Sequence, residues 1–407
     1  MEKIVINGGV PLFGRVDISG SKNAALPLLY ATLPLRGISY IDNLPDISDV
    51  RVSLKILEGF GARVEYDGTL ARIDTSQVEY SVPAPSLISE LRASSYLIGA
   101  SLSAFGRAHI QSFGGCNFDT RPIDMHLSAA AALGGEIEGE LIRARRLVGG
   151  EIRFPKISVG ATVNAMLMAA SAHGETNIYN PATEPHIVAL ADFLRASGAS
   201  VEILPGRIRM VGAALSPSRA SVIPDMIEAG TYLIAGLATG GAVTAVGAEP
   251  THLEAFLDML RSAGAEVLVE NGEICARADR LGKISITTAP HPGFPTDLQP
   301  QAAALMALFS GGDITEGVWS ARFGYLSEFE KFGVPSSLSV PRAVIERADI
   351  HPARVTAGDL RAAAAEVILA LAADGESIIE NARHIKRGYS DMKNKLSALG
   401  ARIEYTK

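Results

Sequence analysis

The chain has 407 residues, of which 47% are hydrophobic and 20% charged, a composition typical of a folded globular protein and not of a disordered one. Its length exceeds the ~250–300 residues at which a single hydrophobic core stops growing, so at least two domains are expected. The net charge of −7 gives no overall field that would attract nucleic acid or anionic lipid, and any phosphate-binding function must come from local basic residues.

The two cysteines, Cys116 and Cys275, lie far apart in sequence and in dissimilar contexts, so neither a disulfide framework nor a zinc ribbon is expected. The sequence begins without the pattern of a signal peptide, and no apolar run is long enough to span a bilayer. These features predict a cytoplasmic protein without membrane insertion and without a nucleic-acid partner.

Two short patterns recur along the chain. In the first, glycine follows an apolar or small residue and precedes a strand-like stretch; its glycines are Gly61, Gly134, Gly198, Gly264, Gly333 and Gly400. In the second, glycine closes an Ala/Leu-rich run; its glycines are Gly37, Gly106, Gly174, Gly241, Gly312 and Gly375. Both series give six units of about 68 residues, which together account for the chain.

Each unit predicts the same elements in the same order. An Ala-rich helix such as 23–33 ends at the second-pattern glycine, which can adopt the left-handed conformation of a helix cap. A strand follows, and then an amphipathic helix such as 186–199 or 252–265, which stops at the first-pattern glycine. A β-hairpin closes the unit, with turns at Asp67-Gly68, Pro205-Gly206 and Asn271-Gly272.

One such unit is too small to bury its sheet and both helices, so the units are expected to associate. Because two domains are expected, six units divide into three and three, which predicts an α/β fold with three repeats in each domain. An open solenoid is the alternative, although solenoid repeats are usually ~20–45 residues long and carry polar caps.

Charged residues occupy equivalent positions in the repeats. At a nearly constant spacing before each second-pattern glycine lies the expected start of the Ala-rich helix: Lys22, Arg92, Gly160, Ile227 with Glu228 beside it, Asp297 and Arg361. A short way after each of these glycines lies the expected strand-to-helix loop: Asp49, Cys116, Glu184, Glu249, Arg322 and Arg387. Equivalent positions point to the same side, so these charges should gather at one end of each domain, where ligands commonly bind.

Two interpretations of these charges remain open. Asp297 and Glu228 could simply complement the helix dipole, whereas Lys22, Arg92 and Arg361 face its positive end, and a bound anion would relieve that conflict. Nearby arginines, among them Arg121, suit phosphate and carboxylate groups. Cys116 lies in a Gly-rich loop shortly before Arg121 and is either a reactive thiol or an inert buried cysteine. The sequence has no nucleotide-cofactor or zinc-protease motif, so neither cofactor nor metal is expected.

Eight longer motifs occur along the chain, and their order is specific to one family of enzymes. They are SGSKNAALP, ELRASSYLIGA, GGCNFDTRPIDMHL, KISVGATVNAM, IEAGTYL, APHPGFPTDLQPQ, DLRAAAA and HIKRGY. The chain resembles the enolpyruvyl transferases, specifically the UDP-N-acetylglucosamine 1-carboxyvinyltransferase family, with 5-enolpyruvylshikimate-3-phosphate synthase as the sister family. The resemblance implies a two-domain inside-out α/β barrel with helices inside and sheets outside. It implies one domain from 22–224, a second from 1–21 plus 225–407, and substrates in a cleft between them.

The activity implied by the resemblance is addition–elimination. The enolpyruvyl group of phosphoenolpyruvate is transferred to the 3-hydroxyl of UDP-N-acetylglucosamine and phosphate is released, the first committed step of peptidoglycan synthesis. By resemblance the catalytic residues are Cys116, Asp297, Lys22 and Arg387. The substrate-binding residues implied in the same way are Asn23, Arg92, Arg121, Pro122, Ile123, Asp124, Met125, Lys156, Ser158, Val159, Gly160, Val318, Arg322 and Arg361. A monomer or weak homo-oligomer is expected.

Some residues depart from the family's usual pattern. Beside the retained Arg322 and Arg387 the chain has Ser320, Ala321, Gly324, Tyr325 and Lys386. An enzyme acting on another acceptor, either a related sugar nucleotide or shikimate 3-phosphate, is therefore an alternative. A catalytically silent homologue that binds a nucleotide sugar is another.

Overall fold

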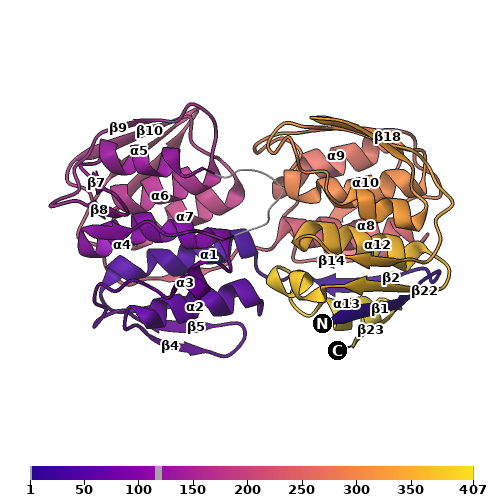
Figure 1. The fold of residues 1–407 in the computed structure, drawn as a ribbon, viewed down its shortest axis with the longest axis horizontal. Coiled ribbons are helices and arrows are strands. Elements are labelled where there is room, and N and C mark those ends of the chain that lie inside the picture. The colour runs from indigo at the N-terminus through magenta and orange to yellow at the C-terminus, as the bar shows by residue number, and fades with distance from the viewer. Residues whose placement is uncertain (1, 115–121, 407) are drawn as a thin grey trace. The chain divides into compact units, whose positions relative to one another are not determined.

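The computed structural model describes residues 2–114 and 122–406, which form two compact units (Figure 1). One holds the described residues from Gly20 to Ile223, and we call it the central unit. The other holds those through Ser19 and those from Pro224 onward, and we call it the terminal unit. The fold is α/β, as predicted, and each unit contains three repeats.

The central unit contains the first three repeats. The first consists of α1 (Lys22–Ala31), η1 (Leu33–Leu35), β3 (Ile38–Asp42), α2 (Ser48–Gly59), β4 (Arg63–Tyr66) and β5 (Ala71–Asp74). The second consists of α3 (Pro85–Ile88), η2 (Arg92–Tyr96), α4 (Leu97–Phe105), β6 (Arg107–His109), α5 (Asp124–Ala132), β7 (Glu136–Glu138) and β8 (Leu141–Arg143). The third consists of β9 (Glu151–Arg153), α6 (Val159–Ala169), β10 (Glu175–Tyr179), α7 (Pro185–Ala196), β11 (Ser200–Leu204), β12 (Arg207–Val211) and β13 (Arg219–Ser221).

The terminal unit starts with β1 (Lys3–Asn7) and β2 (Phe13–Asp17). The fourth repeat adds α8 (Met226–Ala238), β14 (Ala242–Val246), η3 (Pro250–His252), α9 (Glu254–Ala263), β15 (Glu266–Glu270) and β16 (Glu273–Arg277). The fifth adds β17 (Ile284–Thr288), η4 (Thr296–Leu298), α10 (Gln299–Leu308), β18 (Gly312–Glu316), α11 (Leu326–Phe329), η5 (Glu330–Phe332), β19 (Ser336–Ser339) and β20 (Arg342–Ile345). The sixth adds β21 (Arg354–Thr356), α12 (Leu360–Ala372), β22 (Glu376–Glu380), η6 (Ala382–Arg387), α13 (Met392–Ala398) and β23 (Arg402–Thr406).

The Ala-rich helices form the interior of each unit. In the terminal unit α8, α10 and α12 contact one another, and every residue of α12 from Leu360 to Leu371 is buried. Small alanine side chains permit this close approach, and a helix that is apolar on all sides belongs in a core. Figure 1 shows the sheets outside these helices in both units. The predicted arrangement of helices inside and sheets outside is confirmed.

The sheets of the terminal unit repeat one pattern. In the terminal unit the strand orders are β15-β16-β14-β2, β17-β18-β20-β19 and β21-β22-β1-β23. In each, one edge strand is parallel to its neighbour and the other pairs are antiparallel, as where β17 runs parallel to β18 from Ile284 opposite Gly312 to Thr288 opposite Glu316. The central unit has β13-β3-β5-β4, β11-β12-β10-β9 and β6-β8-β7. The predicted hairpins correspond to β4–β5, β11–β12 and β15–β16.

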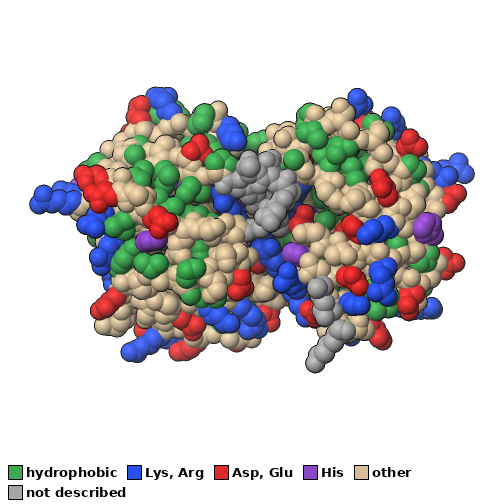
Figure 2. Space-filling view, viewed as in Figure 1, with side chains coloured by type: hydrophobic (Ala, Val, Ile, Leu, Met, Phe, Trp, Pro, Cys, Tyr) green, Lys and Arg blue, Asp and Glu red, His purple; other side chains and the backbone are tan. Residues whose placement is uncertain are grey.

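Cross-strand ion pairs cover the outer faces of these sheets. Arg209 of β12 pairs with Glu175 of β10 at 2.7 Å, and Arg277 of β16 pairs with Glu266 of β15 at 2.8 Å. Figure 2 shows acidic and basic side chains spread over the surface of both units. Such exposed pairs contribute little to stability, and they make the outer faces polar.

The glycine caps were predicted only in part. All six first-pattern glycines have positive φ, from 88° at Gly333 to 111° at Gly198. Of the second pattern, Gly106, Gly174 and Gly375 have positive φ, whereas Gly37, Gly241 and Gly312 do not. There the preceding residue, Arg36, Gly240 or Gly311, takes the left-handed conformation. Glycine is still needed at Gly241 for a different reason, because a Cβ there would lie 1.9 Å from the Leu12 carbonyl oxygen.

Candidate active site

In the terminal unit, Asp297 lies between two arginines. It belongs to the 3-10 turn η4 that precedes α10, so the expected helix start is a 3-10 turn here. Its Oδ1 accepts from Arg322 Nη1 at 2.8 Å, and its Oδ2 accepts from Arg361 Nη2 at 3.0 Å. Both arginine side chains are almost completely buried, whereas 27% of the Asp297 side chain is exposed. The two buried guanidinium groups thus fix the carboxylate, and part of the Asp297 side chain stays accessible to solvent.

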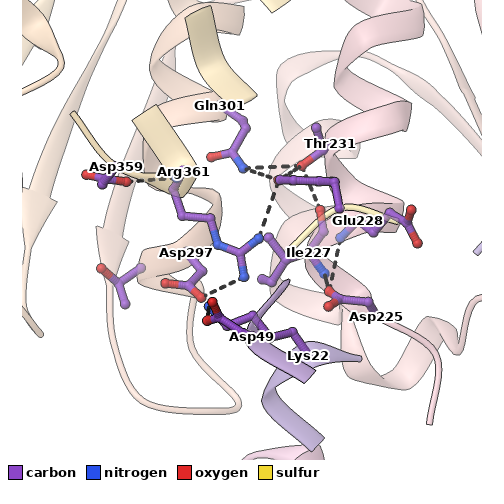
Figure 3. Close-up of polar contacts among 12 residues, drawn as sticks. Lys22, Asp49, Asp225, Ile227, Glu228, Thr231, Asp297, Gln301, Asp359 and Arg361 are labelled. Carbon is purple, nitrogen blue, oxygen red and sulfur yellow. Dashed lines mark hydrogen bonds and ion pairs between the residues drawn. The ribbon is translucent and has the colours of Figure 1, made fainter. Parts of the chain in front are cut away.

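Arg361 also forms a hydrogen bond outside its pair with Asp297. Its Nη1 donates to the Tyr389 hydroxyl at 3.4 Å, and that hydroxyl also bonds Thr231 Oγ1 at 2.9 Å and Gln301 Nε2 at 3.2 Å. Burial opposes the charge of Arg361, but Asp297, Tyr389 and Asp225 favour it more strongly and raise the pKa of Arg361 above its ordinary value. Figure 3 shows Arg361 between Asp297 and the side chains of Gln301 and Thr231.

Two of the three inner helices of the terminal unit, α8 and α12, begin with carboxylate caps that were not predicted from the sequence. Asp225 Oδ1 accepts from the backbone of Ile227 and Glu228 at the start of α8, at 2.8 and 3.1 Å. Asp359 Oδ1 accepts from the backbone of Arg361 and Ala362 at the start of α12, at 2.7 and 3.1 Å. Both aspartates stand at the same distance before the second-pattern glycine of their repeat, so the repeat alignment contained the signal for them.

Glu228 does more than complement the dipole of α8. This buried carboxylate accepts from Lys395 Nζ at 2.8 Å and from the backbone nitrogen of Ser19 at 2.7 Å. Burial raises the pKa of Glu228, and the Lys395 ammonium acts against that rise. The pair joins α8 to α13 and to the segment that follows β2.

In the central unit, the cation at the start of α1 has a carboxylate partner. Lys22 Nζ lies 3.1 Å from Oδ2 of Asp49, which is in the first turn of α2 and is 4% exposed. The predicted conflict between Lys22 and the helix dipole is therefore relieved at least partly by the protein's own carboxylate. Substrate binding by Lys22 stays a prediction.

Two of the predicted substrate-binding residues, Gly160 and Arg92, lie near His126 of α5. Ser158 caps α6, accepting from the backbone of Ala161 at 3.4 Å, and a Cβ at Gly160 would lie 2.9 Å from His126 Cε1. His126 Nδ1 lies 2.8 Å from Asn164 Nδ2. Burial and the nearby Arg92 lower the pKa of His126 to about 4, so the imidazole is neutral at pH 7. Arg92 begins η2 and not the α-helix α4.

The remaining predicted residues take the following positions. Val159 begins α6, Asp124 and Met125 begin α5, Asn23 is the second residue of α1, and Arg387 ends η6. Pro122, Ile123, Lys156 and Val318 lie outside helices and strands, and Val318 donates its backbone N–H to Glu316 at 2.9 Å. Cys116 and Arg121 lie outside the described residues.

The departures from the usual family residues differ in setting. Ser320, Ala321 and Gly324 are exposed. Tyr325 is 4% exposed, and its ring centroid lies 4.9 Å from that of Phe329, so it belongs to the core. Lys386 is exposed and forms an ion pair with Glu2.

No group of three or more His, Cys, Asp or Glu side chains among the described residues could hold a metal ion. None of the helices in that part of the chain has the length and apolar character needed to cross a membrane.

Comparisons with known proteins define the class. The family model described as EPSP synthase (3-phosphoshikimate 1-carboxyvinyltransferase) matches residues 6–396. The chain therefore belongs to this family of carboxyvinyltransferases and is an enzyme of the transferase class. It is 44% identical over 414 residues to a protein of Caldanaerobacter subterraneus named UDP-N-acetylglucosamine 1-carboxyvinyltransferase 3, with 99% of each chain covered. It is 41% identical to a UDP-N-acetylglucosamine 1-carboxyvinyltransferase of Azorhizobium caulinodans, again with 99% of each covered.

Solved structures support the same fold. The enolpyruvyl transferase NikO from Streptomyces tendae matches with a TM-score of 0.87 and 27% identity, over 100% of this chain and 99% of that one. EPSP synthase from Acinetobacter baumannii matches with a TM-score of 0.77 over 100% of both chains. At 17% identity, this second likeness concerns the fold alone.

Proposed function

We propose that this chain transfers the enolpyruvyl group of phosphoenolpyruvate to the 3-hydroxyl of UDP-N-acetylglucosamine and releases phosphate. The observation that carries the proposal is full-length similarity, at 38–44% identity, to curated relatives that bear this activity in their names. The site around Asp297 supports it, because a partly exposed carboxylate held by cations suits a group that accepts a proton from a substrate hydroxyl.

The reaction has two parts. The sugar oxygen forms a bond to C2 of phosphoenolpyruvate while the hydroxyl loses its proton and C3 gains one. The tetrahedral ketal then loses phosphate from C2 as C3 gives up a proton, which restores the double bond. The enzyme must therefore supply a base near the hydroxyl, an acid near C3 and cations for the carboxylate and phosphate groups.

Asp297 is the proposed base. Its side chain is partly exposed, so a substrate hydroxyl can reach the carboxylate that Arg322 and Arg361 hold. The two arginines are proposed to fix the direction of the carboxylate, which lowers the entropy that the reaction must lose.

The other roles follow from the resemblance. Cys116 is proposed as the acid–base group at C3 or as an aid to phosphate departure. Lys22, Arg121 and Arg387 are proposed to bind phosphoenolpyruvate. The residues around His126 and the start of α6 are proposed to bind the UDP-sugar, since a helix N-terminus favours an anionic diphosphate. A cytoplasmic location, a monomer or weak oligomer, and domains at 22–224 and at 1–21 plus 225–407 stay predictions.

An acceptor screen tests the proposal. Phosphoenolpyruvate is incubated with enzyme and with UDP-N-acetylglucosamine, a second UDP-sugar or shikimate 3-phosphate, and the enolpyruvyl ether is sought by mass spectrometry. The proposal expects the ether with UDP-N-acetylglucosamine. An ether formed only with another acceptor would contradict the proposed specificity. Stabilisation by UDP-N-acetylglucosamine without any ether would point to a silent homologue.

A further inference from the structure

Thr296 precedes the proposed base in sequence, and its hydroxyl forms two hydrogen bonds, one with Arg322 and one with Glu316. Its Oγ1 accepts from Arg322 Nη1 at 3.0 Å and donates to Glu316 Oε2 at 3.0 Å. The same Arg322 nitrogen donates to Asp297 Oδ1 at 2.8 Å. A hydroxyl has one proton, so the bond to Glu316 directs a lone pair of Thr296 toward Arg322.

Glu316 is fixed by its surroundings. It ends β18 and is 2% exposed, and its Oε1 accepts from Thr288 Oγ1 at 2.5 Å and from the backbone of Val318 and Trp319 at 2.9 and 3.0 Å. Thr288 is its partner across the parallel β17–β18 ladder. The sheet therefore determines where the Glu316 carboxylate lies, and the carboxylate orders the start of the segment that carries Arg322.

The repeat shows that Thr296 departs from its equivalents. Asp225, Thr296 and Asp359 each stand at the same distance before the second-pattern glycine of their repeat. The two aspartates cap α8 and α12, whereas η4 has no side-chain cap bond. In the fifth repeat the equivalent position is occupied by Thr296, the first residue of η4, whose hydroxyl bonds Glu316 and Arg322 instead.

We propose that Glu316 and Thr296 are positioning residues that orient Arg322 against Asp297. This inference rests on the proposed function, in which Asp297 accepts the proton of the sugar hydroxyl. The link runs from the end of β18 through two side chains to the guanidinium, so the direction of the base is set by the sheet.

Four variants test the link. Thr296→Val keeps the shape and removes the hydroxyl, and Thr296→Ser retains the hydroxyl as the conservative rescue. Glu316→Gln keeps an acceptor for the backbone of Val318 and Trp319 but places an amide nitrogen where Thr296 donates. Ser285→Ala is the matched control, because Ser285 Oγ donates to Asp313 at 2.6 Å on the same two strands at an exposed site.

The expected result is a fall in kcat of about 10- to 100-fold for Thr296→Val and Glu316→Gln, with little change in the KM for UDP-N-acetylglucosamine. The acidic limb of the pH–rate profile should move to higher pH, because the carboxylate loses a fixed cation. Thr296→Ser should restore most of the turnover and the profile. Wild-type turnover and profile in Thr296→Val would overturn the proposal, as would an equal loss in Ser285→Ala.

A crystal structure of Thr296→Val tests the link without turnover. The proposal expects Arg322 to leave Asp297 in that variant, and an unchanged ion pair would overturn it. If the wild-type enzyme forms no product with UDP-N-acetylglucosamine, the proposed function fails, while this structural result still decides whether Thr296 positions Arg322.

Discussion

The Asp297 carboxylate is partly exposed and is held by two buried arginines. As the proposed base, it should affect the chemical step much more than the binding of the sugar nucleotide. Replacing Asp297 with asparagine keeps the size of the side chain and removes the negative charge. We expect kcat to fall by about 10²- to 10⁴-fold, the usual contribution of general-base catalysis, with UDP-N-acetylglucosamine binding nearly intact. Single-turnover kinetics together with calorimetric titration checks both parts. Loss of sugar binding in a folded Asp297→Asn protein would contradict the role of base.

Glu366 is a fully buried carboxyl group in the middle of α12. Within the described part of the chain, neither of its carboxylate oxygens has a hydrogen-bond partner. Burial, together with Glu328 and Asp359, raises the pKa of Glu366 to about 8, and Lys331 opposes this only in part. At neutral pH the group therefore remains protonated in the folded protein.

This buried acid predicts a pH dependence of stability. Between its ordinary pKa of 4.5 and about 8, the folded state binds a proton that the unfolded state has lost. Stability is then highest below that range and falls as pH rises through it. Glu366→Gln should flatten the fall in Tm over this range, whereas the exposed Glu346→Gln should not. An unchanged slope in Glu366→Gln would refute the assignment.

The sequence located Asp297, Arg322 and Arg361 but not the contacts among them. Repeat positions show which residues begin an inner helix, because helix length and cap position are local properties. The bond between Thr296 and Glu316 could not be predicted in this way, because it depends on the pairing of β17 with β18. Glu316 carries no local signal beyond its place at the end of a strand. The partner of Lys22 was missed for the same reason, since α1 and α2 meet only in the folded unit.

At the scale of elements, a glycine's role depends on what lies beside it. Gly241 immediately precedes β14, and a Cβ there would meet the Leu12 carbonyl oxygen at 1.9 Å, while a Cβ at Gly59 of α2 would meet nothing within 4 Å. Gly241→Ala must push β2 away from β14, and we expect a loss of roughly 1–3 kcal/mol or more in the free energy of unfolding. Gly59→Ala should be neutral or stabilising by about 0.5–1 kcal/mol. Denaturant midpoints measure both, and equal effects would contradict the packing argument.

The hairpins and amphipathic helices were predicted well because their signals are periodic and local. The left-handed caps at Gly37, Gly241 and Gly312 were predicted wrongly, since the same glycine pattern serves two purposes. In three repeats it supplies positive φ, and in the others it permits a close approach of another backbone segment or side chain. Sequence spacing alone does not distinguish conformational freedom from missing volume.

At the scale of the whole molecule, the first strands complete a unit whose other elements follow Pro224. β1 lies between β22 and β23, antiparallel to both, and β2 runs parallel to β14. Deleting residues 1–19 should leave these strands without ladder partners, and hydrogen exchange should quicken across the terminal unit. The central unit should keep its protection, because its sheets contain neither strand. Unchanged protection of β22 and β23 would contradict this account.

The proposed transfer of the enolpyruvyl group to UDP-N-acetylglucosamine releases phosphate, so an assay of phosphate follows the reaction itself. Purified enzyme, its active-site concentration confirmed, is supplied with phosphoenolpyruvate, with the sugar nucleotide, or with both. The account predicts catalytic release of phosphate only when both are present, and a large loss of that release in Asp297→Asn and Cys116→Ser. Absence of release with both substrates, or release that does not depend on the sugar nucleotide, would contradict it.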